Sequence, residues 1–254
     1  MSTTINNFRI VSLVPSLTEL LVSLGLEKSI IGVTKFCVHP SYIKKQVEVI
    51  GGTKNPKLDK ILLLNPTHII TNKEENNKED VDFLSNHSFV HVSDIKTIED
   101  VFVVLKEYAS LFKVYHQAMH IDELLRRKLA QFQTELLYEK EISVAYLIWK
   151  EPWMTIGSDT FIHEMLTISK FKNVFEKQTR YPEINLQDLQ QADVVFLSSE
   201  PYPFKQKHID LIKNYNQQAF FVDGELFSWY GSRLLHAFDY FIQLRSQVKL
   251  SLSQ

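Results

Sequence analysis

The stretch from Thr97 to Leu137 contains neither proline nor glycine, and none of it alternates between apolar and polar residues as a β-strand would. Thr97 followed by Asp100 is typical of a helix start. Further along, apolar residues recur every three or four positions, the spacing of one helix face: Ile121, Leu125, Leu129, Phe132 and Leu136. The pattern predicts only helix here, with a break near residues 113–115 and a long helix over 115–137.

On both sides of this helical stretch, short apolar runs alternate with helical patterns. The predicted strands are residues 9–13, 30–33, 68–71, 90–92, 142–148, 194–197 and 219–222. Such alternation favours parallel sheets covered by helices. The predicted fold class is therefore α/β, with two α/β lobes joined by a long rigid connecting helix. The N-terminal lobe is expected at residues 1–105, the helical connector at 106–141 and the C-terminal lobe at 142–254.

The turn after the first predicted strand has a helix-start signal of its own. Ser16 and Glu19 have the spacing of a capping box. A helix is predicted to run from there to Leu24, with Gly25 as a left-handed C-terminal cap. Ser16 at a strand-to-helix turn could also be an exposed nucleophile, but pairing with Glu19 explains it more simply.

Composition excludes several classes of function. The 254 residues carry 28 Lys and Arg against 30 Asp and Glu, so no basic surface predicts nucleic-acid binding. Cys37 is the one cysteine, which excludes an intramolecular disulfide. No apolar run approaches the roughly 20 residues of a membrane helix, so membrane insertion is not expected. Residues 1–7 are polar and do not resemble a signal peptide. The sequence as written predicts a cytoplasmic protein; a truncated start would make it periplasmic.

Motifs for catalysis or metal binding are weak. There is no glycine-rich phosphate loop and no G-x-S-x-G turn. His163 and Glu164 begin a zinc-protease pattern, but Thr167 stands where its second histidine belongs. Cys37 and His39 are suitable zinc or copper ligands. No third ligand is spaced to join them, so no metal site is predicted.

Three segments rich in aromatic residues follow predicted strands: residues 34–40, 149–155 and 223–231. Ligands of open α/β sheets bind outside the carboxyl ends of the strands. Rings in such loops can line a large, mostly apolar pocket. The same rings could instead cover each lobe's own core, and the residues alone leave both interpretations open.

Several blocks resemble the ABC-transporter substrate-binding proteins of the helical-backbone type, which bind cobalamin, haem and ferric siderophores. The resemblance is carried by residues 9–40 (RIVSLVPSLTELLVSLGLEKSIIGVTKFCVHP), 58–76 (LDKILLLNPTHIITNKEEN), 152–175 (PWMTIGSDTFIHEMLTISKFKNVF) and 198–204 (SSEPYPF). It spans nearly the whole chain and is strongest for the cobalamin-binding branch. It implies two lobes joined by a rigid helix, a ligand cleft between the lobes, and no cofactor besides the bound cobalamin or other metal chelate.

The resemblance also implies roles for single residues. It assigns ligand contacts to Phe36, Tyr181, Glu225, Leu226, Phe227, Ser228 and Trp229, and we expect Trp153 near the ligand as well. Family members dock on their permease through one glutamate on each lobe. The matching positions are Asp59 and Gln187, with Asp188 as a neighbouring carboxylate that could substitute. Because Gln187 lacks the charge, ligand binding without stable docking on an ABC permease is expected.

The leading hypothesis is a monomeric, non-enzymatic protein that binds cobalamin or a related corrinoid. A haem or ferric-siderophore binding protein is an alternative, because basic residues lie near predicted strand ends: Lys35, Lys54, Lys73 and Lys150. A cytosolic corrinoid-processing enzyme is an alternative of another class, although no nucleophile–base pair is recognisable. A sensor that signals through lobe opening would need a further bistable element.

Overall fold

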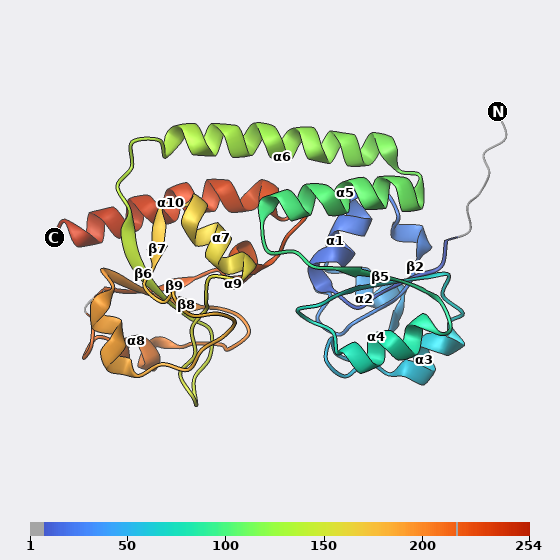
Figure 1. Ribbon diagram of the computed structural model, residues 1–254, viewed down its shortest axis with the longest axis horizontal. Helices are drawn as coiled ribbons and strands as arrows, with labels where there is room; N and C mark the ends of the chain where they lie inside the picture. The colour runs from blue at the N-terminus through green and yellow to red at the C-terminus, as the bar shows by residue number, and fades with distance from the viewer. Residues whose placement is uncertain (1–7, 217) are drawn as a thin grey trace. The chain divides into compact units, whose positions relative to one another are not determined.

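The computed structural model describes residues 8–216 and 218–254, so the polar segment 1–7 lies outside the described residues. The chain forms two compact units (Figure 1). The first runs to Glu123 and also includes Tyr230–Arg233, and the second comprises Leu124–Trp229 and Leu234–Gln254. Helix α6 (Tyr115–Glu135) runs from the first unit into the second and matches the predicted long helix. The α/β class and the connecting helix are thus confirmed.

The first unit contains a five-stranded parallel sheet in the order β3-β2-β1-β4-β5. Its strands are β1 (Ile10–Ser12), β2 (Ile30–Val33), β3 (Glu48–Val49), β4 (His68–Asn72) and β5 (Phe89–Ser93). The chain adds β2 and β3 on one side of β1, and then β4 and β5 on the other. The winding direction therefore reverses between β1 and β4, and ligands of such sheets bind at the carboxyl side of this switch point.

The first unit contains several helices, of which α5 (Ile98–Phe112) has a side-chain cap at its start. The others are α1 (Pro15–Ser23), η1 (Glu27–Ser29), α2 (Ile43–Gln46), α3 (Leu58–Leu63) and α4 (Lys78–Ser85). At the start of α5, the Asp100 N–H donates to Thr97 Oγ1 at 3.2 Å and the Thr97 N–H donates to Asp100 Oδ2 at 2.9 Å. Lys113, in the left-handed conformation with φ 60°, ends α5. The predicted helix start and break are both confirmed.

The predicted capping box of Ser16 and Glu19 is wrong. Helix α1 begins at Pro15, whose fixed φ suits a first helical position and which has no N–H to cap. The Thr18 hydroxyl donates back to the carbonyl of Val14 at 2.9 Å. Glu19 instead pairs with Arg233, far along the chain. Gly25 has φ 78°, as predicted for the residue after this helix.

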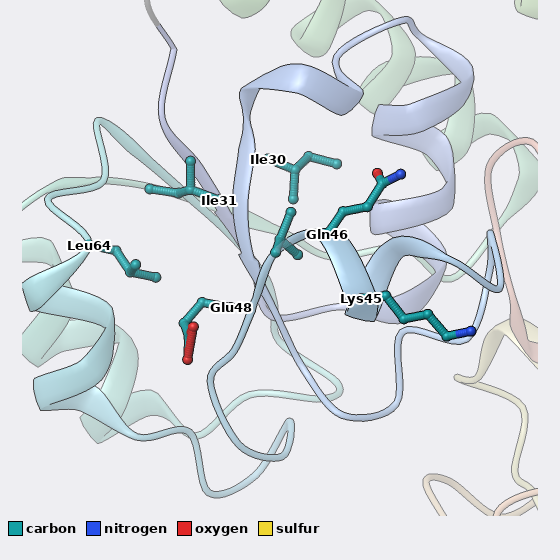
Figure 2. A pocket seen from close by; sticks show the side chains of 7 residues that line it. Ile30, Ile31, Lys45, Gln46, Glu48 and Leu64 are labelled. Carbon is teal, nitrogen blue, oxygen red and sulfur yellow. The ribbon is translucent and has the colours of Figure 1, made fainter.

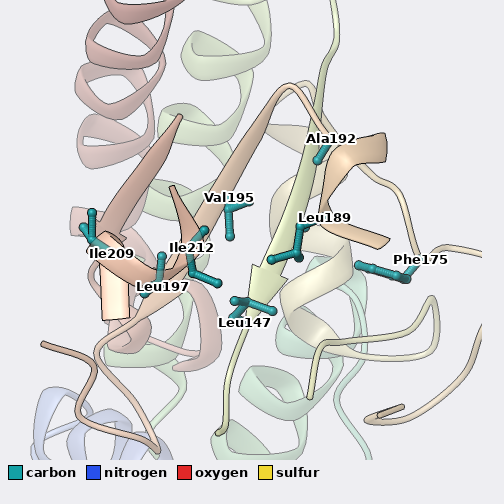
Figure 3. Close-up of a cluster of buried hydrophobic side chains, with 9 residues drawn as sticks. Leu147, Phe175, Leu189, Ala192, Val195, Leu197, Ile209 and Ile212 are labelled. Atoms are coloured by element: carbon teal, nitrogen blue, oxygen red, sulfur yellow. The ribbon is translucent and has the colours of Figure 1, made fainter. Parts of the chain in front are cut away.

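The second unit contains a four-stranded parallel sheet in the order β7-β6-β8-β9. Its strands are β6 (Ile142–Leu147), β7 (Phe171–Asn173), β8 (Val194–Ser198) and β9 (Ala219–Val222). Figure 3 shows one of its core clusters, in which Leu147 and Leu197 of the sheet meet Leu189 and Ile212 from the covering helices. These helices are η2 (Leu186–Gln191) and α8 (Gln206–Ile212). The winding direction reverses between β6 and β8.

Three further helices complete the second unit: α7 (Phe161–Ile168), α9 (Gly224–Ser228) and α10 (Leu234–Leu252). The buried side chain of Arg245 links helix α10 to the segments before β6 and β7. Its guanidinium donates to the carbonyls of Ser169 at 2.8 Å, Lys170 at 2.7 Å and Lys140 at 2.8 Å. Among the residues that the structure describes, none of the helices is long and apolar enough to cross a membrane.

Candidate functional site

The carboxyl edge of the first sheet presents the ring of Phe36, in the loop that follows β2. The side chain is 49% exposed. The Lys35 ammonium lies 4.9 Å from the ring centre. Gly52 lies close beside the ring, because a Cβ at this position would be 3.4 Å from Phe36 and 2.3 Å from Asn55 Oδ1. The Lys35 N–H donates to the Gly51 carbonyl at 2.8 Å. This hydrogen bond links the loop that carries Phe36 to the loop that contains Gly51.

Cys37, the next residue, anchors the same loop. Its sulfur is buried and lies 3.1 Å from Thr18 Oγ1 and 3.3 Å from Thr34 Oγ1. Burial raises the pKa of the Cys37 thiol, an effect that these hydroxyl contacts only partly oppose. A thiol of raised pKa is a poor nucleophile and a poor metal ligand, so Cys37 has a packing role. Within residues 8–216 and 218–254, no cluster of three or more His, Cys, Asp or Glu could hold a metal ion.

Asparagine side chains link the loops around the switch point of the first sheet. Asn76 accepts the N–H of Asn72 at 2.9 Å and donates to the Thr53 carbonyl at 3.0 Å. Asn72 also contacts the hydroxyl of buried Tyr230, in the returning segment 230–233. The pKa of Tyr230 is raised by burial and by the nearby carboxylate of Glu75. Sequence reasoning missed this network; paired asparagines directly after a buried strand were the available signal.

The segment that the resemblance assigned to the ligand in the second unit folds as helix α9. Asp223 Oδ1 caps it, accepting from the N–H groups of Glu225 at 3.0 Å and Leu226 at 3.4 Å. The Ser228 hydroxyl donates back to the Gly224 carbonyl at 2.8 Å. The side chains of Glu225, Leu226 and Ser228 are half-buried.

The two aromatic residues of this segment are buried. The Phe227 ring lies 5.1 Å from that of Tyr146 and 4.7 Å from that of Phe241, and its side chain has no exposed surface. Trp229 is only 7% exposed. The structure therefore gives Phe227 a core position.

Tyr181 and Trp153 lie on paired segments of the second unit. The Ile184 N–H donates to the Trp153 carbonyl at 2.9 Å, and the Thr155 N–H donates to the Pro182 carbonyl at 3.0 Å. Tyr181 is half-buried, with the Arg180 guanidinium 5.5 Å from its ring centre. Trp153 is stacked on Phe204 with 6.0 Å between ring centres and packs against the core cluster of Figure 3.

The lysines near the strand ends have partners of their own. Lys54 Nζ donates to the Glu74 carbonyl at 2.8 Å, Lys73 pairs with Asp94 at 2.8 Å and Lys150 pairs with Glu151 at 2.9 Å. The described edge of the second sheet also carries Glu200 in the loop after β8, and Asp223 and Glu225 at the start of α9. Lys73 and Lys150 are thus balanced by carboxylates, whereas Lys54 keeps its charge and Lys35 lies beside the ring of Phe36.

The three candidate permease-docking residues differ in how exposed their side chains are. Asp59 is exposed in the first turn of α3, and Gln187 is exposed in η2. Asp188 is half-buried, and its Oδ2 accepts the N–H of Asn185 at 3.0 Å as part of the η2 cap. One of its carboxylate oxygens is thus committed within its own unit.

The first unit also has an open hollow (Figure 2). It is lined by Ile30, Ile31, Lys45, Gln46, Val47, Glu48 and Leu64. Ile30 and Ile31 begin strand β2, so the hollow lies by the amino-terminal part of this strand. Ligands of open α/β sheets bind at the carboxyl side. This hollow is not a strong candidate site.

Comparisons with known proteins agree with this architecture. The sequence profile of the family described as "Periplasmic binding protein" matches residues 10–220. A vitamin B12-binding protein of Vibrio campbellii is 23% identical over 194 residues, covering 75% of this chain and 70% of the relative. The solved structure of the periplasmic vitamin B12-binding protein BtuF of Vibrio cholerae has a TM-score of 0.78 at 20% identity, covering 97% of this chain and 98% of that one.

A haem-binding protein is equally similar in fold. The apo form of the periplasmic protein RhuT from Roseiflexus sp. RS-1 has a TM-score of 0.81 at 16% identity, and the match covers 97% of this chain and 99% of that one. At these identities the structural matches show the fold. They do not distinguish between the two ligands.

The prediction of a cytoplasmic protein is wrong. It rested on the polar residues 1–7, which lie outside the described residues. The matching family and the solved neighbours are periplasmic binding proteins. These relatives indicate an extracytoplasmic location.

Proposed function

This chain belongs to the periplasmic binding protein family, and on that basis we propose that it is a non-enzymatic substrate-binding protein for cobalamin or a closely related corrinoid. Proteins of this family bind solutes, and the named relatives bind vitamin B12 or haem as a ligand. The relative from Vibrio campbellii supports the corrinoid as the ligand class.

The half-exposed ring of Phe36 is the observation that carries the proposal. A corrin is a broad, largely apolar disc with amides on its rim, and an aromatic ring face can pack against it. Phe36 offers such a face at the carboxyl edge of the first sheet, on a loop anchored by buried Cys37. A ring that is exposed without ligand gains apolar burial when the disc covers it.

Haem is the second candidate, supported by the fold of the haem-binding neighbour. A haem carries two propionates, which proteins commonly bind with arginine or lysine. Here Lys73 and Lys150 are paired with carboxylates, and Lys54 donates to a backbone carbonyl. The carboxylate partners of Lys73 and Lys150 make these two lysines less available to an anionic ligand.

The candidate nucleophiles do not support an enzyme. Ser16 is 2% exposed and Cys37 has no exposed surface. Burial raises the pKa of the Cys37 thiol, which disfavours the reactive thiolate. An ABC permease is the partner that membership of a transporter-linked family implies, with exposed Asp59 as a docking contact.

Titration calorimetry of the purified protein with cyanocobalamin, haemin and a ferric hydroxamate siderophore tests the proposal. Saturable one-to-one binding that is tightest for cyanocobalamin is the expected result. Tighter binding of haemin would identify haem as the ligand in place of the corrinoid. Absence of binding to all three would overturn the proposed function.

A further inference from the structure

Two aromatic side chains of the second unit meet where its sheet reverses direction. Trp149 follows β6 and Tyr202 follows β8, and these strands are hydrogen-bonded neighbours with Leu147 opposite Leu197. The ring centres of Trp149 and Tyr202 are 5.4 Å apart, and the rings are inclined by 72° in an edge-to-face contact. Trp149 is 39% exposed. The pair therefore lies at the switch point, where ligands of such sheets bind.

Backbone hydrogen bonds order the two loops that carry Trp149 and Tyr202. On the β6 side, the Met154 N–H donates to the Trp149 carbonyl at 3.2 Å, and the Ile148 N–H donates to the Met154 carbonyl at 3.0 Å. On the β8 side, the Phe204 N–H donates to the Tyr202 carbonyl at 2.9 Å, and the Phe204 ring lies 4.8 Å from that of Tyr202. A pre-organised aromatic surface loses little conformational entropy on binding.

His208 lies behind the loop that carries Tyr202 and is only 3% exposed. Its Nδ1 accepts the N–H of Lys205 at 2.7 Å, so the proton of the neutral ring lies on Nε2. In the described part of the chain, Nε2 has no hydrogen-bond partner. The rings of Tyr202 and Phe204 lie 5.6 Å and 5.5 Å away, and aromatic faces are weak acceptors for such an N–H. His208 therefore packs against both rings of this loop.

We propose that Trp149 and Tyr202 form the ligand-contacting surface of the second unit and receive the flat conjugated face of the ligand. The inference rests on the proposed function and assigns the contact to residues other than Phe227 and Trp229. Those two side chains are 0% and 7% exposed, whereas Trp149 offers free ring surface. The adjacent Lys150 is paired with Glu151 at 2.9 Å.

The test compares Trp149→Ala and Tyr202→Ala with Tyr138→Ala, a control in the same unit whose side chain is 94% exposed. Calorimetry with cyanocobalamin should show binding at least about 10-fold weaker for the first two variants, the effect of losing one large buried ring. The control should bind as wild type does. Trp149→Phe and Tyr202→Phe keep a ring face and should retain most of the affinity, and thermal melting should confirm that all variants are folded.

Hydroxyl-radical footprinting of the unmodified full chain gives a second measurement. Saturating cyanocobalamin should protect Trp149 from oxidation and leave Tyr138 unprotected. The inference is overturned if wild type binds cyanocobalamin but both alanine variants bind equally well, or if Trp149 is not protected; the proposed function then stands. If wild type binds none of the three ligands, the proposed function fails and the inference fails with it.

Discussion

Arg233 and Glu19 form a bidentate ion pair although they are 214 positions apart in the sequence. Arg233 Nε donates to Oε2 and one terminal nitrogen donates to Oε1, both at 2.9 Å. The side chains are 14% and 19% exposed. The pair fastens the segment Tyr230–Arg233 to helix α1 within the first unit. Parallel charge-assisted hydrogen bonds of this kind are stronger than single neutral ones.

Removing this pair should loosen helix α1. Arg233→Ala is expected to lower the free energy of unfolding by about 2 kcal/mol, because it leaves a shielded carboxylate without its donors. Arg233→Lys should recover only part of this loss, since an ammonium lacks the planar fork of the guanidinium. Urea unfolding and hydrogen exchange at the α1 amides measure the effect. Lys172→Ala, at an exposed position, is the control. Equal exchange in Arg233→Ala and the control would contradict the prediction.

Phe36→Ala should weaken binding of cyanocobalamin by about 10-fold and change stability little, because the ring is half exposed before the ligand covers it. Calorimetry and thermal melting measure the two effects separately. Leu63→Ala removes a side chain that is 82% exposed in the same unit and should change neither. Unchanged affinity in Phe36→Ala would remove the main support for the ligand site at the first sheet.

Phe227→Ala should lower the free energy of unfolding and leave ligand binding by the folded protein intact. The ring is fully buried against Tyr146 and Phe241, so its loss leaves a cavity that costs about 3–5 kcal/mol. Chemical unfolding should show this loss, and the folded fraction should still bind ligand. A large loss of affinity with unchanged stability would instead give Phe227 the ligand contact that the resemblance implied.

Acid should destabilise the second unit through His208. Its pKa is lowered from 6.5, first by burial and then by Lys207, Lys150 and Lys205, with Glu151 acting in the opposite direction. A group whose folded-state pKa is lower than its unfolded-state pKa stabilises the fold fully above the unfolded value. This contribution is lost as the pH falls through the folded-state pKa. Protonated His208 also cannot accept the N–H of Lys205.

Unfolding free energies measured at a series of pH values below about 6.5 should therefore fall less steeply in His208→Asn than in wild type. The asparagine amide oxygen can accept the same N–H and does not titrate. Some slope should remain, because burial also lowers the pKa of His68 in the first unit. Identical slopes would exclude His208 as an acid-sensitive group.

Gln187→Glu should strengthen docking on the cobalamin ABC permease of the host, because it restores a carboxylate that can meet arginine. Asp59→Asn should weaken docking. Rim charges act mainly on the association rate, so both effects should shrink at high salt. Binding kinetics on the permease in lipid discs measure them. Asp188→Asn should affect docking less, since Asp188 already caps η2; a larger effect than that of Asp59→Asn would show that Asp188 is the docking carboxylate.

Elements with complete local signals were predictable from the sequence. The capping box of Thr97 and Asp100 and the apolar repeat of the long helix Tyr115–Glu135 both lie within neighbouring turns of the chain. Strands β3 and β7 were missed, because two or three residues show no periodicity. Helix α9 was taken for a loop, although the cap residue Asp223 was its available signal.

The candidate site was less predictable, because exposure depends on partners distant in the sequence. Phe227 and Trp149 are both aromatic residues in segments after strands, yet only the first finds a buried place among Tyr146, Phe196 and Phe241. Glu19 illustrates the same limit. Its spacing from Ser16 indicated a local cap, whereas its partner Arg233 is 214 residues away.

Residues 230–233 belong to the first unit but are translated after all strands of the second unit. At a translation rate of roughly 5–20 residues per second, Arg233 leaves the ribosome about 10–40 s after Glu19. Until then the nascent first unit lacks both this ion pair and the Tyr230 hydroxyl beside Asn72. The first unit is therefore completed only after the whole second sheet has been synthesised. A truncated chain that ends before residue 230 contains every strand of the first sheet but not the segment that closes its fold.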